Sequence, residues 1–113
     1  MFYEPEKGRS VLQEISVTEL NASLEKEQSF ALFVYTPMCG TCKLAERMLE
    51  VTSEALPAIS IYKLNINLAQ GLAERFMITS VPALLLFQNG KLLERHFAIQ
   101  SVGFLYEVLK PLA

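Results

Sequence analysis

The chain has 113 residues, of which 51% are hydrophobic, and its formal net charge is −2. This length predicts a single domain, residues 1–113, with enough apolar side chains to build a core without structural metals or disulfides. The balanced charge argues against nucleic acid as a partner, and the longest apolar runs, such as 83–87, are too short to cross a membrane.

The first ten residues, MFYEPEKGRS, carry charges of both signs and lack the apolar stretch of a secretory signal. We therefore expect the protein to be cytoplasmic. Structural disulfides are rare in that compartment because its thiol pools reduce them. The only two cysteines, Cys39 and Cys42, are three positions apart, and a bridge that closes so short a loop would stabilise the fold little. This spacing favours a chemical role for the pair.

The N-terminal third predicts two strands separated by a helix. Residues 11–15 are a short strand candidate, and Ser16 and Glu19 have the spacing of a capping box. This box predicts a helix over 18–27. Residues 30–35 are apolar throughout, as expected of a strand that is covered on both faces.

A second helix is predicted over 40–54, after Thr36-Pro37 has broken the strand. Its expected inner stripe consists of Leu44, Met48 and Val51. Residues 59–66 then alternate between apolar and more polar side chains, which predicts a third strand. The segment 67–70 is expected to cap a third helix that runs to Met77.

The C-terminal part predicts a hairpin followed by a helix. Residues 83–87 form a buried strand, Asn89-Gly90 favours a tight turn, and 91–98 form the return strand. Ser101 is expected to cap a final helix over 102–109. The resulting order, β-α-β-α-β-α-β-β-α, predicts an α/β fold with a central mixed sheet and helices on both faces.

The segment Cys39-Gly40-Thr41-Cys42 lies where an apolar strand gives way to a helix, a placement typical of thiol–disulfide redox motifs. The unpaired N–H groups and positive dipole end of the helix favour a thiolate at Cys39, which we predict to be the nucleophile. Cys42 lies one turn further on, where it can attack the mixed disulfide. Gly40 is expected to allow a tight turn beside the sulfur.

The alternatives for the two cysteines are a pair of packed thiols or half of a zinc site. A zinc site needs about four ligands, and His96 is the only other cysteine or histidine in the chain. We expect His96 to be a surface residue of the return strand and no metal to be bound.

Three segments resemble the thioredoxin family. Residues 33–43, FVYTPMCGTCK, resemble its active-site segment; residues 63–66, KLNI, resemble the next strand; and residues 81–91, VPALLLFQNGK, resemble its proline strand and hairpin. The resemblance covers about residues 16 to 113. It implies a thioredoxin-like fold and a protein-disulfide reductase whose only redox centre is a Cys39–Cys42 disulfide, without a cofactor.

The resemblance also implies a set of site residues and partners. Val81-Pro82 is expected to be a cis bond beside the cysteines. The expected substrate groove is lined by Met38, Ser80, Val81, Pro82 and Ala98, and the expected supporting residues are Tyr35, Gly40, Thr41 and Lys63. Substrates would be disulfide-containing proteins, and a flavoprotein thioredoxin reductase would recharge the site. We expect no membrane partner and a monomeric protein.

Three residues depart from the family pattern. Met38 stands where the family usually has tryptophan, Thr41 where it has proline, and Phe33 where it has a buried aspartate beneath the second cysteine. Lys63, which normally neighbours that aspartate, is then expected to lack a carboxylate and to reach solvent or be neutral. We hypothesise that Cys42 is consequently poorly activated.

Two other functions fit the same motif. The chain could be a thioredoxin-fold binding or adaptor module with weak redox activity, or an exchanger dedicated to one partner or to a low-molecular-weight thiol. An insulin-reduction assay separates an enzyme from an adaptor, because an adaptor would reduce insulin poorly. A Cys42→Ser variant that traps mixed disulfides separates a dedicated exchanger from a general one.

Overall fold

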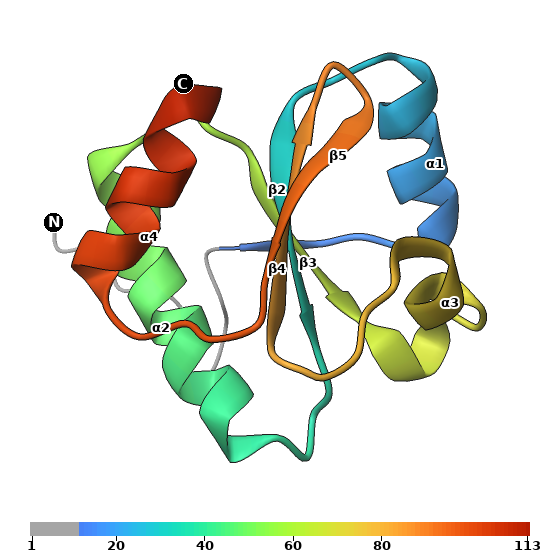
Figure 1. Ribbon diagram of the computed structural model, residues 1–113, viewed down its shortest axis with the longest axis horizontal. Coiled ribbons are helices and arrows are strands. Elements are labelled where there is room, and N and C mark those ends of the chain that lie inside the picture. Colours follow the sequence, from blue (N-terminus) through green and yellow to red (C-terminus); the bar gives the residue numbers. More distant parts are fainter. Residues whose placement is uncertain (1–11) are drawn as a thin grey trace, which may run out of the picture.

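A five-stranded mixed sheet forms the centre of the protein, whose structure is a computed structural model that describes residues 12–113 (Figure 1). The elements in chain order are β1 (Gln13–Glu14), α1 (Val17–Glu25), β2 (Phe30–Tyr35), α2 (Gly40–Ala55), β3 (Ile61–Asn65), the 3-10 turn η1 (Ile66–Leu68), α3 (Leu72–Phe76), β4 (Ala83–Gln88), β5 (Lys91–His96), α4 (Val102–Leu109) and the 3-10 turn η2 (Lys110–Leu112). This order confirms the predicted α/β alternation.

The strands lie in the order β1-β3-β2-β4-β5. β3 is parallel to both β1 and β2, whereas β4 is antiparallel to both β2 and β5. The sheet is therefore mixed, as predicted. Of the predicted strand 11–15, Gln13 and Glu14 form β1; Val11 lies outside the described residues, as does the N-terminal segment used to predict the cellular location.

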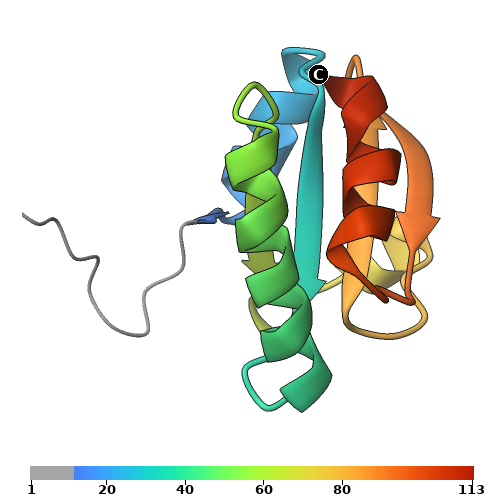
Figure 2. The ribbon, with the colours of Figure 1, turned by 90° about the vertical axis from the view of Figure 1, so that its left-hand side faces the viewer.

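Helices cover both faces of the sheet, and each face has its own core. Helices α2 and α4 lie side by side on one face, which Figure 2 views from the front, while α1 and α3 lie on the other face. Side chains alternate along β2, so that Ala31 and Phe33 enter the α2/α4 core and Leu32 and Val34 enter the α1/α3 core. All four are fully buried, as expected from an apolar strand covered on both faces.

The inner stripe predicted for α2 is wrong for Leu44 and Val51, and only Met48 of the three contacts the core. The buried residues of this helix are Cys42, Ala45, Leu49 and Thr52. Leu44 is 61% exposed and Val51 is 55% exposed, while Met48 packs partly against the core. The two stripes differ by a rotation of the helix about its axis, and hydrophobicity alone favoured the wrong one because the buried stripe contains a small alanine and a threonine.

The third predicted helix is shorter than expected and begins later. The segment 67–70 does not cap it; instead the Asn65 side chain accepts a hydrogen bond from the N–H of Asn67 and starts η1. Helix α3 begins at Leu72 after Gly71, which has a φ of 83° and provides no side-chain cap. A single long helix is thus replaced by a 3-10 turn and a helix of five residues.

The predicted caps and the predicted hairpin are confirmed. Ser16 and Glu19 form the capping box of α1, and Ser101 caps α4 by accepting a hydrogen bond from the N–H of Phe104. Asn89 and Gly90 have φ values of 53° and 80°, the left-handed conformation that a tight hairpin turn requires. Within residues 12–113, none of the helices combines the length and the apolar character needed to span a membrane.

Candidate redox site

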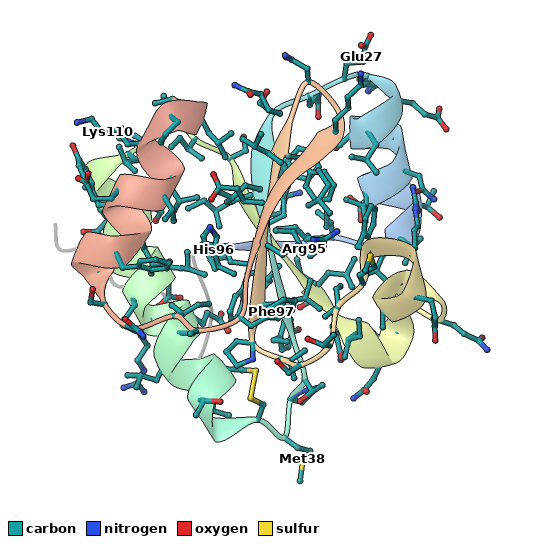
Figure 3. All side chains as sticks on the ribbon, viewed as in Figure 1. Glu27, Met38, Arg95, His96, Phe97 and Lys110 are labelled. Atoms are coloured by element: carbon teal, nitrogen blue, oxygen red, sulfur yellow. A yellow bond between two sulfur atoms is a disulfide. The ribbon has the colours of Figure 1, made fainter. Side chains whose placement is uncertain are left out.

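Cys39 and Cys42 form a disulfide at the N-terminus of α2, just beyond the end of β2 (Figure 3). Cys39 is the N-cap residue of the helix, and its Sγ accepts a hydrogen bond from the N–H of Cys42 at 3.1 Å. The Thr41 hydroxyl lies 3.2 Å from the same sulfur. Both groups can stabilise a negative charge on Cys39 once the disulfide is reduced, because both can donate to it.

The two sulfurs differ in their access to solvent. Cys39 is partly exposed, whereas Cys42 is only 2% exposed and belongs to the α2/α4 core. An external disulfide can therefore reach Cys39 and not Cys42. The buried thiol is positioned to attack only after a bond to Cys39 has formed.

The segment before β4 reaches the same end of the sheet. Val81-Pro82 is a cis peptide bond, as expected. The antiparallel register pairs Ala83 with Val34, which places Val81-Pro82 at the C-terminal end of β2, on the side where Cys39 follows. Val81, Ile99 and Tyr35 pack against the core cluster that contains Cys42. The structure thus brings together the cysteine segment 33–43, the segment before β4, and Ile99, which is next to the predicted groove residue Ala98.

The rim of this end is exposed. Met38 is 93% exposed and projects away from the body of the protein beside the disulfide (Figure 3). Ser80 and Ala98 are exposed, and Pro82 is partly exposed. Gly40 does not have the positive φ that would require glycine, and a Cβ there would meet nothing within 4 Å. The expectation that this glycine makes a tight turn possible is therefore wrong.

Lys63 has a carboxylate partner, contrary to the sequence-based expectation. Its Nζ lies 2.9 Å from Oε2 of Glu46 on α2, and the two side chains are 16% and 19% exposed. Phe33, the register partner of Lys63 on β2, is fully buried in the cluster that contains Cys42. The sequence comparison missed Glu46 because it sought the acid on β2, whereas the helix supplies it four residues after Cys42.

Tyr35 connects this ion pair to the edge strand of the sheet. The Lys63 ammonium lies 5.6 Å from the centre of the Tyr35 ring, and the tyrosine hydroxyl donates a 2.7 Å hydrogen bond to Glu14 on β1. Burial, together with this hydrogen bond and the negative charges of Glu14 and Glu46, raises the pKa of Tyr35. Tyr35 is therefore a neutral hydrogen-bond donor at neutral pH.

His96 has no part in this arrangement. It is partly exposed on β5, where it forms a 2.8 Å contact with Glu94 and meets the Phe104 ring edge-on (Figure 3). Among residues 12–113, no group of three or more histidine, cysteine and acidic side chains is placed to hold a metal ion. The described residues therefore form a redox site that consists of two cysteines, Cys39 and Cys42, joined here as a disulfide.

Comparisons with known proteins agree with this geometry. The family model described as Thioredoxin matches residues 11–107. The chain is 45% identical over 85 residues to the thioredoxin-like protein YusE of Bacillus subtilis, covering 75% of this chain and 80% of that protein. It is 31% identical over 81 residues to thioredoxin-1 of Saccharomyces cerevisiae, covering 72% and 79%. The fold is similar to that of oxidised mitochondrial thioredoxin 3 from Saccharomyces cerevisiae, with a TM-score of 0.77, 19% identity and coverage of 88% and 94% of the two chains.

Proposed function

Because this chain belongs to the thioredoxin family and is a thiol–disulfide oxidoreductase, we propose that Cys39 attacks the disulfides of substrate proteins and that Cys42 releases the product. In the first step the Cys39 thiolate forms a bond to one substrate sulfur, and the other substrate sulfur leaves as a thiolate. In the second step Cys42 attacks Cys39, the mixed disulfide breaks, and the substrate leaves as a dithiol.

The observation that carries this assignment is the contrast between the two sulfurs. Cys39 is accessible at the N-cap of α2, where the N–H of Cys42 and the Thr41 hydroxyl can stabilise its anion. Cys42 is buried directly behind it. The geometry favours Cys39 as the nucleophile and Cys42 as the resolving thiol, since only the first can meet a large substrate.

We infer that substrates bind over the exposed rim around the disulfide. The residues of this groove are Met38, Ser80, Val81, Pro82 and Ala98. Tyr35, Thr41 and Lys63 are its supporting residues. An extended substrate segment would lie along the backbone before Pro82, where the chain has left the sheet, and would gain specificity from backbone hydrogen bonds. The flexible Met38 side chain would adapt to substrates of different shape.

We also propose a cellular role, a location and partners for the protein. The protein acts as a cytoplasmic, monomeric, single-domain reductant that needs no cofactor besides its own disulfide, and a flavoprotein thioredoxin reductase restores the dithiol. Proteins with accessible disulfides are the substrates. Neither nucleic acid nor a membrane is a partner.

The test is the reduction of insulin by dithiothreitol with catalytic amounts of the protein. Wild type should accelerate the reaction, while Cys39→Ser should fall to the uncatalysed rate because no nucleophile remains. Cys42→Ser should instead accumulate stable mixed disulfides, which mass spectrometry of an extract would identify. Wild-type protein that does not accelerate insulin reduction would favour the adaptor function, and a single trapped partner would favour a dedicated exchanger.

A further inference from the structure

The Lys63–Glu46 ion pair lies on the same face of the sheet as Cys42 and takes no part in the steps given above. Lys63 and Phe33 are register partners on β3 and β2, and Phe33 packs in the core cluster that contains Cys42. Glu46 follows Cys42 by four residues on α2, so the two side chains lie on one face of the helix. The carboxylate is therefore placed one helical turn behind the resolving sulfur.

Cys42 needs a proton acceptor before it can attack. Its side chain is almost completely buried, and burial among apolar groups disfavours the thiolate. Phe33, which belongs to the same core cluster, offers no polar atom. Because bulk water has little access to the sulfur, an internal base would accelerate the resolving step.

We propose that Glu46, held in place by Lys63, accepts the proton of Cys42 through a water molecule during the resolving step. This inference rests on the proposed role of Cys42 as the resolving thiol. The Cys42 sulfur forms a bond to Cys39 as its proton moves to the Glu46 carboxylate, and the bond between Cys39 and the substrate sulfur breaks. The substrate leaves as a thiolate and takes a proton from solvent, to which Glu46 later returns its own.

Partial exposure suits Glu46 to this task. At 19% exposure it can return a proton to solvent, while the ammonium of Lys63 at 2.9 Å keeps it oriented. Lys63 also links this carboxylate to the cysteine end of β2, because its ammonium lies 5.6 Å from the centre of the Tyr35 ring. With a base at Glu46, Cys42 would be activated although Phe33 supplies no acid.

Other titratable residues lie on α2 and on strands and helices of the same sheet. The Lys63–Glu46 pair differs from them in its contacts. They are Glu14 on β1, Tyr35 on β2, His96 on β5, Tyr106, Glu107 and Lys110 on α4 and η2, and Lys43, Arg47, Glu50 and Glu54 on α2 itself. Tyr35 is engaged with Glu14, and His96 is engaged with Glu94. Lys43 and Arg47 are exposed on the outer side of the helix.

The proposal can be tested with the reduced full-length chain and one equivalent of 2,2′-dithiodipyridine, which reacts with thiols at acid pH. Cys39 releases one coloured thiopyridone as the mixed disulfide forms, and Cys42 releases the second after a stopped-flow jump to neutral pH. Glu46→Gln should slow the second release about 100-fold and leave the first unchanged. In Glu46→Gln, the rate of the second release should also rise about tenfold per pH unit, because without the base only Cys42 that is already a thiolate can react.

Glu54→Gln is the matched control, since it removes the same charge from an exposed position in the last turn of the same helix. It should behave like wild type, and Glu46→Asp, which keeps a carboxylate, should recover most of the rate. The proposal is wrong if Glu46→Gln resolves at the wild-type rate with the wild-type pH dependence. It is also wrong if both releases slow equally, because the pair would then act only on structure. Loss of the first release in wild type would instead contradict the proposed function.

Discussion

The two ends of the central sheet are built for different purposes. At one end, the β4–β5 turn packs tightly against the C-terminal end of α1: the N–H of Gly90 donates to the carbonyl of Gln28, and the N–H of Asn89 donates to the Ser29 hydroxyl. At the other end, β2 is followed by the Cys39–Cys42 disulfide. Met38, next to this disulfide, is almost fully exposed (Figures 1 and 3).

The hairpin end of the sheet contributes to stability, whereas the cysteine end carries the reactive sulfur. Backbone contacts at the hairpin end leave no room for a side chain, because a Cβ at Gly90 would lie 2.6 Å from the carbonyl oxygen of Leu24. At the cysteine end, by contrast, Met38 is exposed and Cys39 is partly exposed. Changes at the hairpin end should therefore alter folding, and changes at the cysteine rim should alter exchange.

The largest effect on folding within this comparison is expected from Gly90→Ala. The positive φ of Gly90 and the contact with the α1 backbone should together cost about 2 kcal/mol of unfolding free energy. Urea unfolding of the oxidised protein measures this loss, and insulin reduction per folded molecule should not change. Gly103→Ala is the control: it lies in the first turn of α4, where a Cβ would make only an ordinary 3.9 Å contact with the Ser101 hydroxyl, and it should stabilise the protein by about 0.5 to 1 kcal/mol. Equal effects of the two substitutions would remove the basis of the comparison.

A smaller effect is expected from Ser16→Ala, at the start of the helix against which the hairpin packs. The change removes the side-chain acceptor of the α1 capping box and should lower the unfolding free energy by about 1 kcal/mol. Thermal or urea unfolding would detect it. Thr18→Ala, at an exposed position inside the same helix, should be close to neutral; a comparable loss there would show that the cap is not the cause.

The smallest effect on stability is expected from Met38→Ala, at the opposite end. Since the side chain is 93% exposed, the unfolding free energy should change by less than about 0.5 kcal/mol. The KM for insulin should nevertheless rise about threefold, because contact with the protein substrate is lost. The rate with 2,2′-dithiodipyridine, which is too small to use that contact, should stay the same. Leu93→Ala, half exposed on β5, should alter neither parameter, and a matching rise in KM would argue against a groove at Met38.

Local signals in the chain were sufficient for most of the fold. The apolar run of β2, the capping box at Ser16 and the turn at Asn89-Gly90 act over a few residues, and each lies where it was predicted. The strand-to-helix position of Cys39 and Cys42 was likewise readable from the sequence. These features are decided by backbone preferences and short-range hydrogen bonds, which need no knowledge of distant segments.

Other features depended on contacts between distant segments. The rotation of α2, which buries Ala45 and Leu49 and exposes Leu44, is set by the surface against which the helix packs. The partner of Lys63 was not predicted, because Glu46 is brought to it only when α2 folds over β3. Likewise, the hydrogen bond between Tyr35 and Glu14 joins residues that are 21 positions apart.

The sequence by itself therefore determined the order of elements, the caps and the reactive pair of cysteines, since these depend on residues that are close along the chain. Only the tertiary structure decided which face of α2 is buried and which carboxylate pairs with Lys63. Burial and ion pairing at such places depend on side chains that packing brings together, and here the carboxylate that pairs with Lys63 on β3 comes from a helix.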